Sequence, residues 1–291
     1  MTTTTPAAAP PKLSWNYYGR HPEDLQITAD PGPAPSAVTA AAGAGRGIRV
    51  CVVDSGVEPD HPLVGPIEGS WAAVKGEDDE IRIEPGDGGD ACGHGTACAS
   101  IIRRAAPGVS LYSVRVLGAR FSGSGDVLVA GLRWAVRQRF DVINLSLSTT
   151  RTRFAEELHA LADEAYFART VIVASAHNTP VESFPWRFAS VISVGSHGES
   201  DPELHLYNPA PPVEFFAPGQ NVTVGWLRGT TIRTTGNSFA TPYVAGLCAR
   251  ILSEHPGMTS FQLKNALYLA AANVRLVDSG LGREEEVPHA Q

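Results

Sequence analysis

Short apolar runs rich in valine and isoleucine recur along most of this chain, separated by longer segments. Such runs are typical of buried parallel strands, and they occur at 48–53, 111–116, 142–147, 171–174 and 191–194. The longer segments predict helices at 94–104, 125–139, 153–168 and 238–254. Because strands and helices alternate, we predict a three-layer α/β/α fold, in which helices cover both faces of a mostly parallel, twisted sheet.

Two further elements complete the predicted domain. Residues 221–235 alternate in a way that predicts a β-hairpin, and residues 259–272 predict a last helix. The domain is therefore expected to span residues 46–275, followed by a solvated tail at 276–291.

Residues 1–45 differ in composition from the rest of the chain. They are rich in alanine, proline and threonine, and such sequence buries too little apolar surface to fold. We therefore expect a mostly disordered extension. Its one aromatic patch, Trp15, Tyr17 and Tyr18, is able to dock on the domain.

Composition narrows the choice of partners. The chain has 291 residues, 43% of them hydrophobic, which is enough for one α/β core. Its net charge of −7 argues against nucleic acid or an anionic membrane as a partner. No apolar run is long enough to span a bilayer, and the first residues lack the basic and apolar regions of a secretory signal, so a cytoplasmic location is expected.

Three segments carry the chemistry. Asp54 ends the apolar run at 48–53, His94 opens an apolar helix between two glycines, and Ser238 lies in the first turn of another helix. We expect Asn237 to cap that helix and Pro242 to fall within its first turn. A serine becomes a good nucleophile when an imidazole takes its proton and a carboxylate orients the imidazole. Asp54, His94 and Ser238 are therefore the predicted catalytic residues of an acyl-transfer enzyme.

The four cysteines are predicted to be reduced thiols: Cys51, Cys92, Cys98 and Cys248. Cys92 and Cys98 flank His94 in a C-x-H-x3-C pattern, but no second ligand pair follows at zinc spacing. We therefore predict no metal. The glycines at 43–47 precede a strand, whereas a dinucleotide fingerprint follows one, so no cofactor is predicted.

With these motifs the chain resembles the subtilisin-like serine peptidases (subtilases) over residues 46–275. DSGVEPDHP around Asp54, GHGTACAS around His94 and GNSFATPYVAG around Ser238 are similar to the family's three motifs, in the family's order. The resemblance implies a peptide or protein substrate. It also implies an oxyanion hole made by the backbone N–H of Ser238 and the side chain of Asn178.

The same resemblance places an extended peptide between two segments. One contains Phe121, Ser122 and Gly123, and the other is the stretch Ser146, Leu147 and Ser148. The primary pocket is expected to be lined by 174–176 and closed near Ser183. Leu128 and Leu147 are the candidates for an apolar outer pocket. The predicted substrate-binding residues are thus Ser122, Gly123, Leu128, Ser146, Leu147, Ser148, Ala174, Ser175, Ala176 and Ser183.

Three positions depart from the family's pattern. His177 and Ser148 stand where the family usually has glycine, and either side chain could narrow the primary pocket. Leu63 replaces the aspartate expected at a calcium site, so no calcium is predicted there.

Three hypotheses about function follow. The first is a serine endopeptidase that works through an acyl-enzyme intermediate and is able to process a dedicated precursor peptide. The second is a peptide-binding protein of the subtilase fold with a blocked or inactive site. An α/β-hydrolase esterase is disfavoured, because the chain has no Gly-x-Ser-x-Gly elbow and the order of the three residues differs.

Overall fold

The computed structural model describes residues 19, 21–29, 44–120 and 122–276. Several predicted features lie outside the described residues: the aromatic patch Trp15, Tyr17 and Tyr18, the cleft residue Phe121, and nearly all of the tail at 276–291. Within the described part of the chain, no helix has both the length and the apolar character needed to span a membrane.

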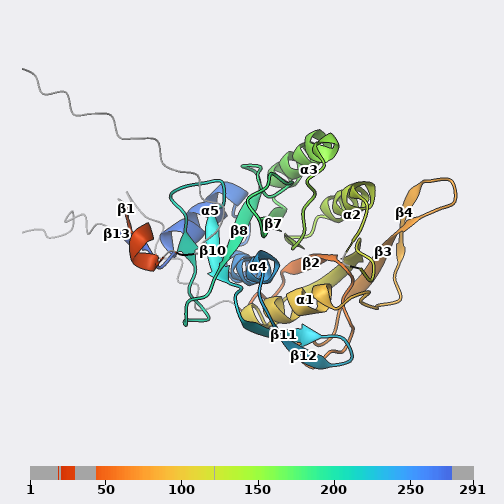
Figure 1. Cartoon of the computed structure of the whole chain (residues 1–291), viewed down its shortest axis with the longest axis horizontal. Helices are drawn as coiled ribbons and strands as arrows, with labels where there is room; N and C mark the ends of the chain where they lie inside the picture. The colour runs from red at the N-terminus through yellow and green to blue at the C-terminus, as the bar shows by residue number, and fades with distance from the viewer. Residues whose placement is uncertain (1–18, 20, 30–43, 121, 277–291) are drawn as a thin grey trace, which may run out of the picture.

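A nine-stranded sheet forms the centre of the molecule (Figure 1). Its strands are β2 (Arg49–Asp54), β3 (Gly69–Lys75), β4 (Ile81–Pro85), β5 (Ser110–Arg115), β6 (Val142–Leu145), β7 (Val171–Ser175), β8 (Ile192–His197), β9 (Leu206–Tyr207) and β10 (Phe215–Pro218). Their order is β4-β3-β5-β2-β6-β7-β8-β10-β9. The edge pairs β3–β4 and β9–β10 are antiparallel and the other pairs are parallel, so the predicted mostly parallel sheet is confirmed.

Helices cover both faces of this sheet. Successive side chains of β2 point to opposite faces, as a strand requires. Val50 and Val52 pack with residues of α1 (His94–Ala105), α4 (Asn237–Glu254) and α5 (Ser260–Leu269). Cys51 and Val53 pack instead with α2 (Gly125–Arg137) and α3 (Ala155–Phe167). The predicted helices and the three-layer arrangement are confirmed, with ends displaced by a few residues.

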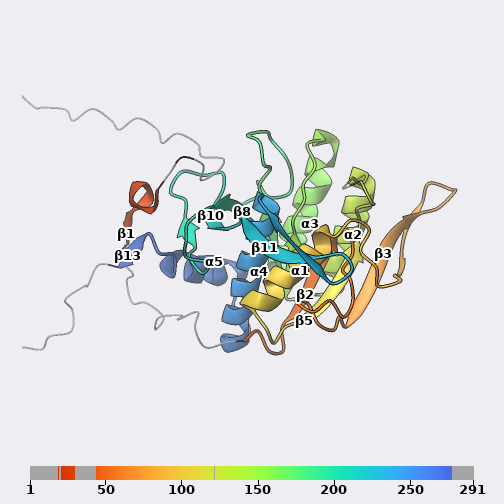
Figure 2. The same ribbon diagram turned by 60° about the horizontal axis from the view of Figure 1, so that its bottom comes forward.

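The predicted hairpin is also present, as β11 (Val222–Trp226) and β12 (Thr230–Thr234). It lies beside α1, where the backbone N–H of Gly225 donates to the hydroxyl of Ser100 at 2.9 Å (Figure 2). The hairpin therefore covers the helix that begins with His94.

Some elements were not predicted from the sequence. The β3–β4 pair extends the sheet at one edge. In addition, β1 (Ile27–Ala29) pairs in parallel with β13 (Val274–Leu276), after the short 3-10 helix η1 (Pro22–Leu25). Part of the extension expected at 1–45 thus contains regular structure, and the domain boundary expected at 275 falls inside β13. A second 3-10 helix, η2 (Thr152–Phe154), precedes α3.

The parallel strands bring the candidate chemistry to one edge of the sheet. β2 ends at Asp54, β6 at Leu145 and β7 at Ser175, and these strands are neighbours in the sheet. In open α/β sheets, ligands bind beyond the carboxyl ends of the strands. The N-termini of α1 and α4 lie at this same edge, which is where the site is found.

Candidate active site

Asp54 is the buried anchor of the site. Its side chain is 0% exposed at the end of β2. One carboxylate oxygen, Oδ1, accepts the backbone N–H of Ser55 at 2.7 Å. The Nδ1 atom of His94 lies 2.8 Å from Oδ1 and 3.0 Å from Oδ2. The sequence-predicted pairing of Asp54 with His94 is therefore present.

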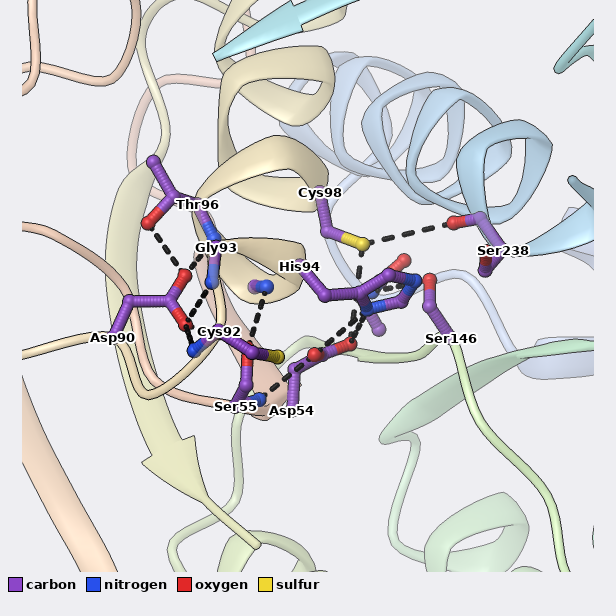
Figure 3. Close-up of polar contacts among 12 residues, drawn as sticks. Asp54, Ser55, Asp90, Cys92, Gly93, His94, Thr96, Cys98, Ser146 and Ser238 are labelled. Carbon is purple, nitrogen blue, oxygen red and sulfur yellow. Dashed lines mark hydrogen bonds and ion pairs between the residues drawn. The ribbon is translucent and has the colours of Figure 1, made fainter. Parts of the chain in front are cut away.

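His94 is the first residue of α1, and its position depends on the glycines on either side. Gly93 has a left-handed backbone (φ 92°), and a Cβ there would lie 2.7 Å from the Trp226 ring. A Cβ on Gly95 would overlap the carbonyl oxygen of Gly56. Because a carboxylate only accepts hydrogen bonds, Nδ1 of His94 carries the proton that faces Asp54. Nε2 is then the basic nitrogen, and Figure 3 shows the ring between Asp54 and the segment that contains Ser238.

Ser238 is the second residue of α4, and the local contacts differ from those predicted. Asn237 is not the cap of the helix: Gly236 occupies that position, and Asn237 is the first helical residue. The side chain of Asn237 reaches inward, where its Oδ1 accepts the N–H of Ser196 at 2.9 Å. The side chain of Asn237 therefore makes a contact in the interior instead of capping α4. Pro242 was expected in the first turn of the helix. It is the sixth helical residue and therefore lies in the second turn.

The later position of Pro242 has a consequence for Ser238. A helical N–H donates to the carbonyl four residues earlier, and proline has no N–H. The carbonyl oxygen of Ser238 therefore lacks its helical partner, and the Sγ of Cys98 lies 3.6 Å from it. The same sulfur is 3.9 Å from Oδ2 of Asp54, so the Cys98 thiol lies between Asp54 and the backbone of Ser238, next to the His94 ring (Figure 3).

Asn178 lies beside the start of α4. Its Oδ1 accepts the backbone N–H of Asn237 at 2.9 Å. Since that N–H can only donate, the atom facing it is the amide oxygen, and the NH₂ group points elsewhere. The amide of Asn178 thus caps α4 with its oxygen and keeps Nδ2 available as a donor next to Ser238.

Asp90 is a residue of the site that sequence analysis missed. Its carboxylate accepts the N–H of Gly93 at 2.8 Å and of Thr96 at 2.8 Å, and so caps α1 (Figure 3). It also accepts the hydroxyl of Ser55 at 2.7 Å, and that hydroxyl accepts the N–H of Gly95 at 3.0 Å. Asp90 thus connects the end of β2 to the start of α1. An acid just before an apolar helix is a known capping signal, which could have identified it.

The electrostatic balance at His94 sets the expected pH dependence. Burial by itself lowers the pKa of His94, but the charge and hydrogen bond of Asp54, with a smaller contribution from Asp90, leave this pKa raised. A general base must be neutral, and the neutral fraction grows as pH rises. The acid limb of kcat/KM for peptide hydrolysis should therefore have its midpoint above the ordinary histidine value of about 6.5.

A pH profile of kcat/KM at constant ionic strength tests this expectation. Asp90→Asn removes one of the negative charges near the His94 ring. The midpoint of the acid limb should therefore lie at lower pH in this variant than in the wild-type protein. A wild-type midpoint at or below the ordinary histidine value would contradict the prediction.

Three potential metal ligands meet at this site within the described residues: Asp54, His94 and Cys98, with ligand atoms within 4.8 Å of one another. Burial, followed by the charge of Asp54, holds the pKa of the Cys98 thiol well above its usual range, which disfavours the thiolate that a metal needs. The Asp54 oxygens are also engaged by His94 and Ser55. The trio fits the hydrogen-bonded arrangement better than a metal centre.

The four cysteines are free and buried, as predicted for reduced thiols.

The predicted substrate-binding residues fall into two groups. Ser122 and Gly123 are exposed, Leu147 and Ser148 are partly buried, and all four are open to a ligand. Ser146, Ser175 and Ala176 are nearly buried at the carboxyl ends of β6 and β7. Leu128, Ala174 and Ser183 are buried as well, and Leu128 and Ala174 pack in the core between the sheet and α2–α3.

Comparison with known proteins identifies relatives of this site. A model of the subtilase family (peptidase S8) matches residues 45–285. Subtilisin E of Bacillus subtilis (strain 168) is 31% identical over 238 residues, which cover 77% of this chain and 60% of the relative. Subtilisin DY of Bacillus licheniformis is 30% identical over 245 residues, covering 79% of this chain and 85% of the relative. The chain thus spans less than two thirds of subtilisin E.

Solved structures agree with these relatives. A cold-adapted subtilisin-like serine proteinase matches with a TM-score of 0.64 and 28% identity, covering 77% of this chain and 82% of the other. The structure named Sphericase matches with a TM-score of 0.66 and 26% identity, covering 77% and 83%. The fold is therefore similar to that of proteins described as subtilisin-like.

Proposed function

The chain belongs to the subtilase family, and from that premise we propose that it is a serine endopeptidase that cleaves peptide bonds through Asp54, His94 and Ser238. One observation carries the proposal: the buried Asp54 carboxylate holds Nδ1 of His94 at 2.8 Å, beside α4, whose second residue is Ser238. This arrangement leaves Nε2 of the imidazole as a base for a serine hydroxyl.

The first chemical step is acylation of Ser238. Nε2 of His94 takes the hydroxyl proton as Oγ bonds to the substrate carbonyl carbon. The imidazolium that forms is stabilised by the buried charge of Asp54, which stays ionised. His94 then gives this proton to the departing amine as the C–N bond breaks, leaving an ester on Ser238. In the second step, water gives a proton to His94 and attacks the ester, which releases the acid and restores the serine.

The negative oxygen of the tetrahedral intermediates needs donors placed in advance. Ser238 lies in the first turn of α4, where backbone N–H groups have no acceptor within the helix and the helix dipole is positive. Asn178 adds its NH₂ group, which is oriented because its oxygen already accepts the N–H of Asn237. The two donors together form the proposed oxyanion hole.

Asn178→Ala is expected to lower kcat by about 10²–10³-fold, because one donor to the developing charge is lost. KM should change little if the donor acts mainly in the transition state. Steady-state hydrolysis of a chromogenic peptide measures both constants. Asn221→Ala would be a poor control because that residue has a left-handed backbone (φ 55°). Thr150→Ala, at an exposed position beyond the cleft, serves instead. A kcat for Asn178→Ala equal to that of wild type would remove Asn178 from the oxyanion hole.

We expect the substrate to be a peptide or an unfolded segment of protein. An extended chain would pair through its backbone with Ser122–Gly123 on one side and Ser146–Ser148 on the other. A Cβ on Gly123 would overlap the carbonyl oxygen of Val116, so glycine is needed for this segment to lie against the end of β5. Processing of a dedicated precursor peptide is a narrower form of the same proposal.

The experiment that tests the proposal is labelling by a fluorophosphonate at neutral pH, together with hydrolysis of a denatured protein such as casein. Labelling of wild type and its loss in Ser238→Ala would support an active serine peptidase. A protein that binds peptides but neither reacts with the probe nor hydrolyses casein would be the binding protein of our second hypothesis.

We further propose a cytoplasmic location. The four unpaired cysteines support it, because reducing compartments keep thiols free. One relative, by contrast, is named minor extracellular protease Epr, so the location needs its own test. Fractionation of the producing cells, with detection of the protein by antibody, would decide between the cell interior and the medium.

A further inference from the structure

Two backbone segments form the walls of the proposed primary pocket. Residues 146–148 continue from β6 and residues 176–178 continue from β7, and the two strands are paired through Leu145 and Ala174. Both walls adjoin the proposed catalytic residues. On one side, Ser146 lies beside the His94 ring (Figure 3). On the other side, the side-chain NH₂ of Asn237 donates to the carbonyls of Ala176 at 3.3 Å and His177 at 3.1 Å.

These attachments fix where the pocket opens. Asn237 directly precedes Ser238, and Figure 3 shows Ser146 beside the His94 ring. The space between the walls therefore opens beside the serine that attacks the substrate. The residue just before the cleaved bond carries the attacked carbonyl, so its side chain is the one that meets this space.

The end of this space is closed by hydrogen bonds. The hydroxyl of Ser148, from the first wall, lies 3.0 Å from the hydroxyl of Ser183. Ser183 is 0% exposed, and its hydroxyl accepts the indole N–H of buried Trp186 at 2.7 Å. One residue further along each segment, Thr149 and Phe184 exchange two backbone hydrogen bonds of 2.9 Å. Side-chain and backbone hydrogen bonds thus connect the first wall to residues 183–184, which form the floor of the space.

A large side chain cannot pass between two hydroxyls that are 3.0 Å apart. To enter, it would have to separate Ser148 from Ser183. The flanking backbone pair of Thr149 and Phe184 and the indole of Trp186 both resist that separation. Residues without a long side chain need no such opening.

We infer that the hydrogen bond between Ser148 and Ser183 closes the primary pocket, and that this enzyme cleaves after glycine, alanine or serine. The inference rests on the proposed endopeptidase function and adds the class of substrate. Aromatic and long aliphatic residues before the cleaved bond are excluded by the closed floor.

The charges near the pocket agree with this preference. Glu182, next to Ser183, is the acid best placed to attract a basic side chain, but Arg187 donates to it at 2.9 Å. His177, which also stood out in the sequence, has its Nδ1 bonded to Thr179 within its own loop. Ser148, rather than His177, is therefore the residue that determines the size of the pocket.

The test uses acylated tetrapeptide p-nitroanilides that differ only in the last residue: glycine, alanine, serine, leucine, phenylalanine or lysine. For the wild-type protein we expect kcat/KM to be at least about 100-fold higher with alanine than with phenylalanine, since misfit in a closed pocket costs this much or more. Equal hydrolysis of the alanine and phenylalanine substrates would overturn the inference.

Variants of Ser148 test the mechanism of exclusion. Ser148→Gly removes the hydroxyl and the Cβ but leaves Ser183 bonded to Trp186, so the buried indole keeps its acceptor. Ser148→Gly should raise kcat/KM for the substrate that ends in phenylalanine about 10-fold or more. Ser148→Ala should raise the same kcat/KM by a smaller factor. Thr150→Gly, an exposed position two residues away, is the matched control and should retain the wild-type preference. The melting temperature of Ser148→Gly shows whether this variant is folded. If it is folded and its ratio of kcat/KM for the alanine substrate to kcat/KM for the phenylalanine substrate equals that of wild type, the inference is wrong.

Labelling with the small fluorophosphonate probe separates the two levels of the proposal. Probe labelling of Ser238 together with rapid cleavage after phenylalanine would overturn the inference that the pocket is closed but would leave the endopeptidase function standing. Absence of both labelling and hydrolysis of all six substrates would overturn the endopeptidase function and, with it, the inference.

Discussion

Ser238→Ala should lower kcat for peptide hydrolysis by about 10⁶-fold, the size of loss found when the nucleophile of such a triad is removed. In the proposed mechanism the hydroxyl oxygen of Ser238 bonds to the substrate, and no other group described at the site replaces it. Cys98 is the nearest potential nucleophile, but burial keeps its pKa high and its side chain is 0% exposed. Activity that remains should come only from binding and the oxyanion donors.

The fold should survive this substitution. Ser238 is only partly buried and alanine favours helices, so the melting temperature should stay close to that of wild type. Ser200→Ala, at an exposed position in a loop, is the control and should retain full activity. If Ser238→Ala keeps most of the activity against casein, the assignment of the nucleophile is wrong.

Asp54→Asn is expected to lower kcat about 10⁴-fold, the loss seen when the acid of a comparable triad becomes an amide. The charge of Asp54 orients the proton on Nδ1 of His94 and stabilises the imidazolium formed during acylation. An amide of the same shape supplies neither effect. The buried position makes the charge important, because the Asp54 side chain is shielded from bulk solvent.

The pH profile of this variant offers a second readout. The Asp54 charge and hydrogen bond are the main causes that raise the pKa of His94 against the effect of burial. Without this charge and this hydrogen bond, the acid limb in the pH profile of the residual activity should have its midpoint at lower pH. Asp60→Asn is a suitable control, because this exposed residue has a left-handed backbone (φ 57°) that asparagine tolerates. An unshifted acid limb in Asp54→Asn would show that another group controls it.

Glu214 and Lys264 show how the fold supports the site from a distance. The Lys264 ammonium lies 2.7 Å from Oε1 of Glu214 and also donates to the carbonyls of Ala189 and Val191. The pair joins α5 to the start of β10, and the carbonyl contacts of Lys264 join α5 to the loop before β8, the strand that in turn binds Asn237 through Ser196. Nothing in the local sequence of either residue predicts this pairing, because fifty positions separate them.

Much of the fold and of the candidate site could be predicted from the sequence because their signals are local. The valine-rich runs predicted β2, β5, β6, β7 and β8, since a strand buried on both faces needs apolar residues along its whole length. The glycines around His94 mark close approaches, of Gly93 to the Trp226 ring and of Gly95 to the backbone of Gly56. The order of three motifs was sufficient to indicate the chemistry.

Tertiary structure decided what depends on residues far apart in the chain. The pairing of β1 with β13 joins the two ends of the chain, and no short-range pattern encodes it. Asn237 looked like a helix cap, but its side chain found better partners in Ser196 and the carbonyls of the pocket wall. Leu128 and Ala174 belong to the core because packing against α2 and α3, rather than their place in a motif, determines their exposure.

The closed pocket is the clearest example of this division. The order of residues shows that a serine stands at 148 and another at 183, and that the first replaces the glycine usual in the family. Only the tertiary structure brought the two hydroxyls to 3.0 Å and placed Trp186 behind them. A hydrogen bond depends on distance and direction in space, whereas a sequence motif records only the order of residues.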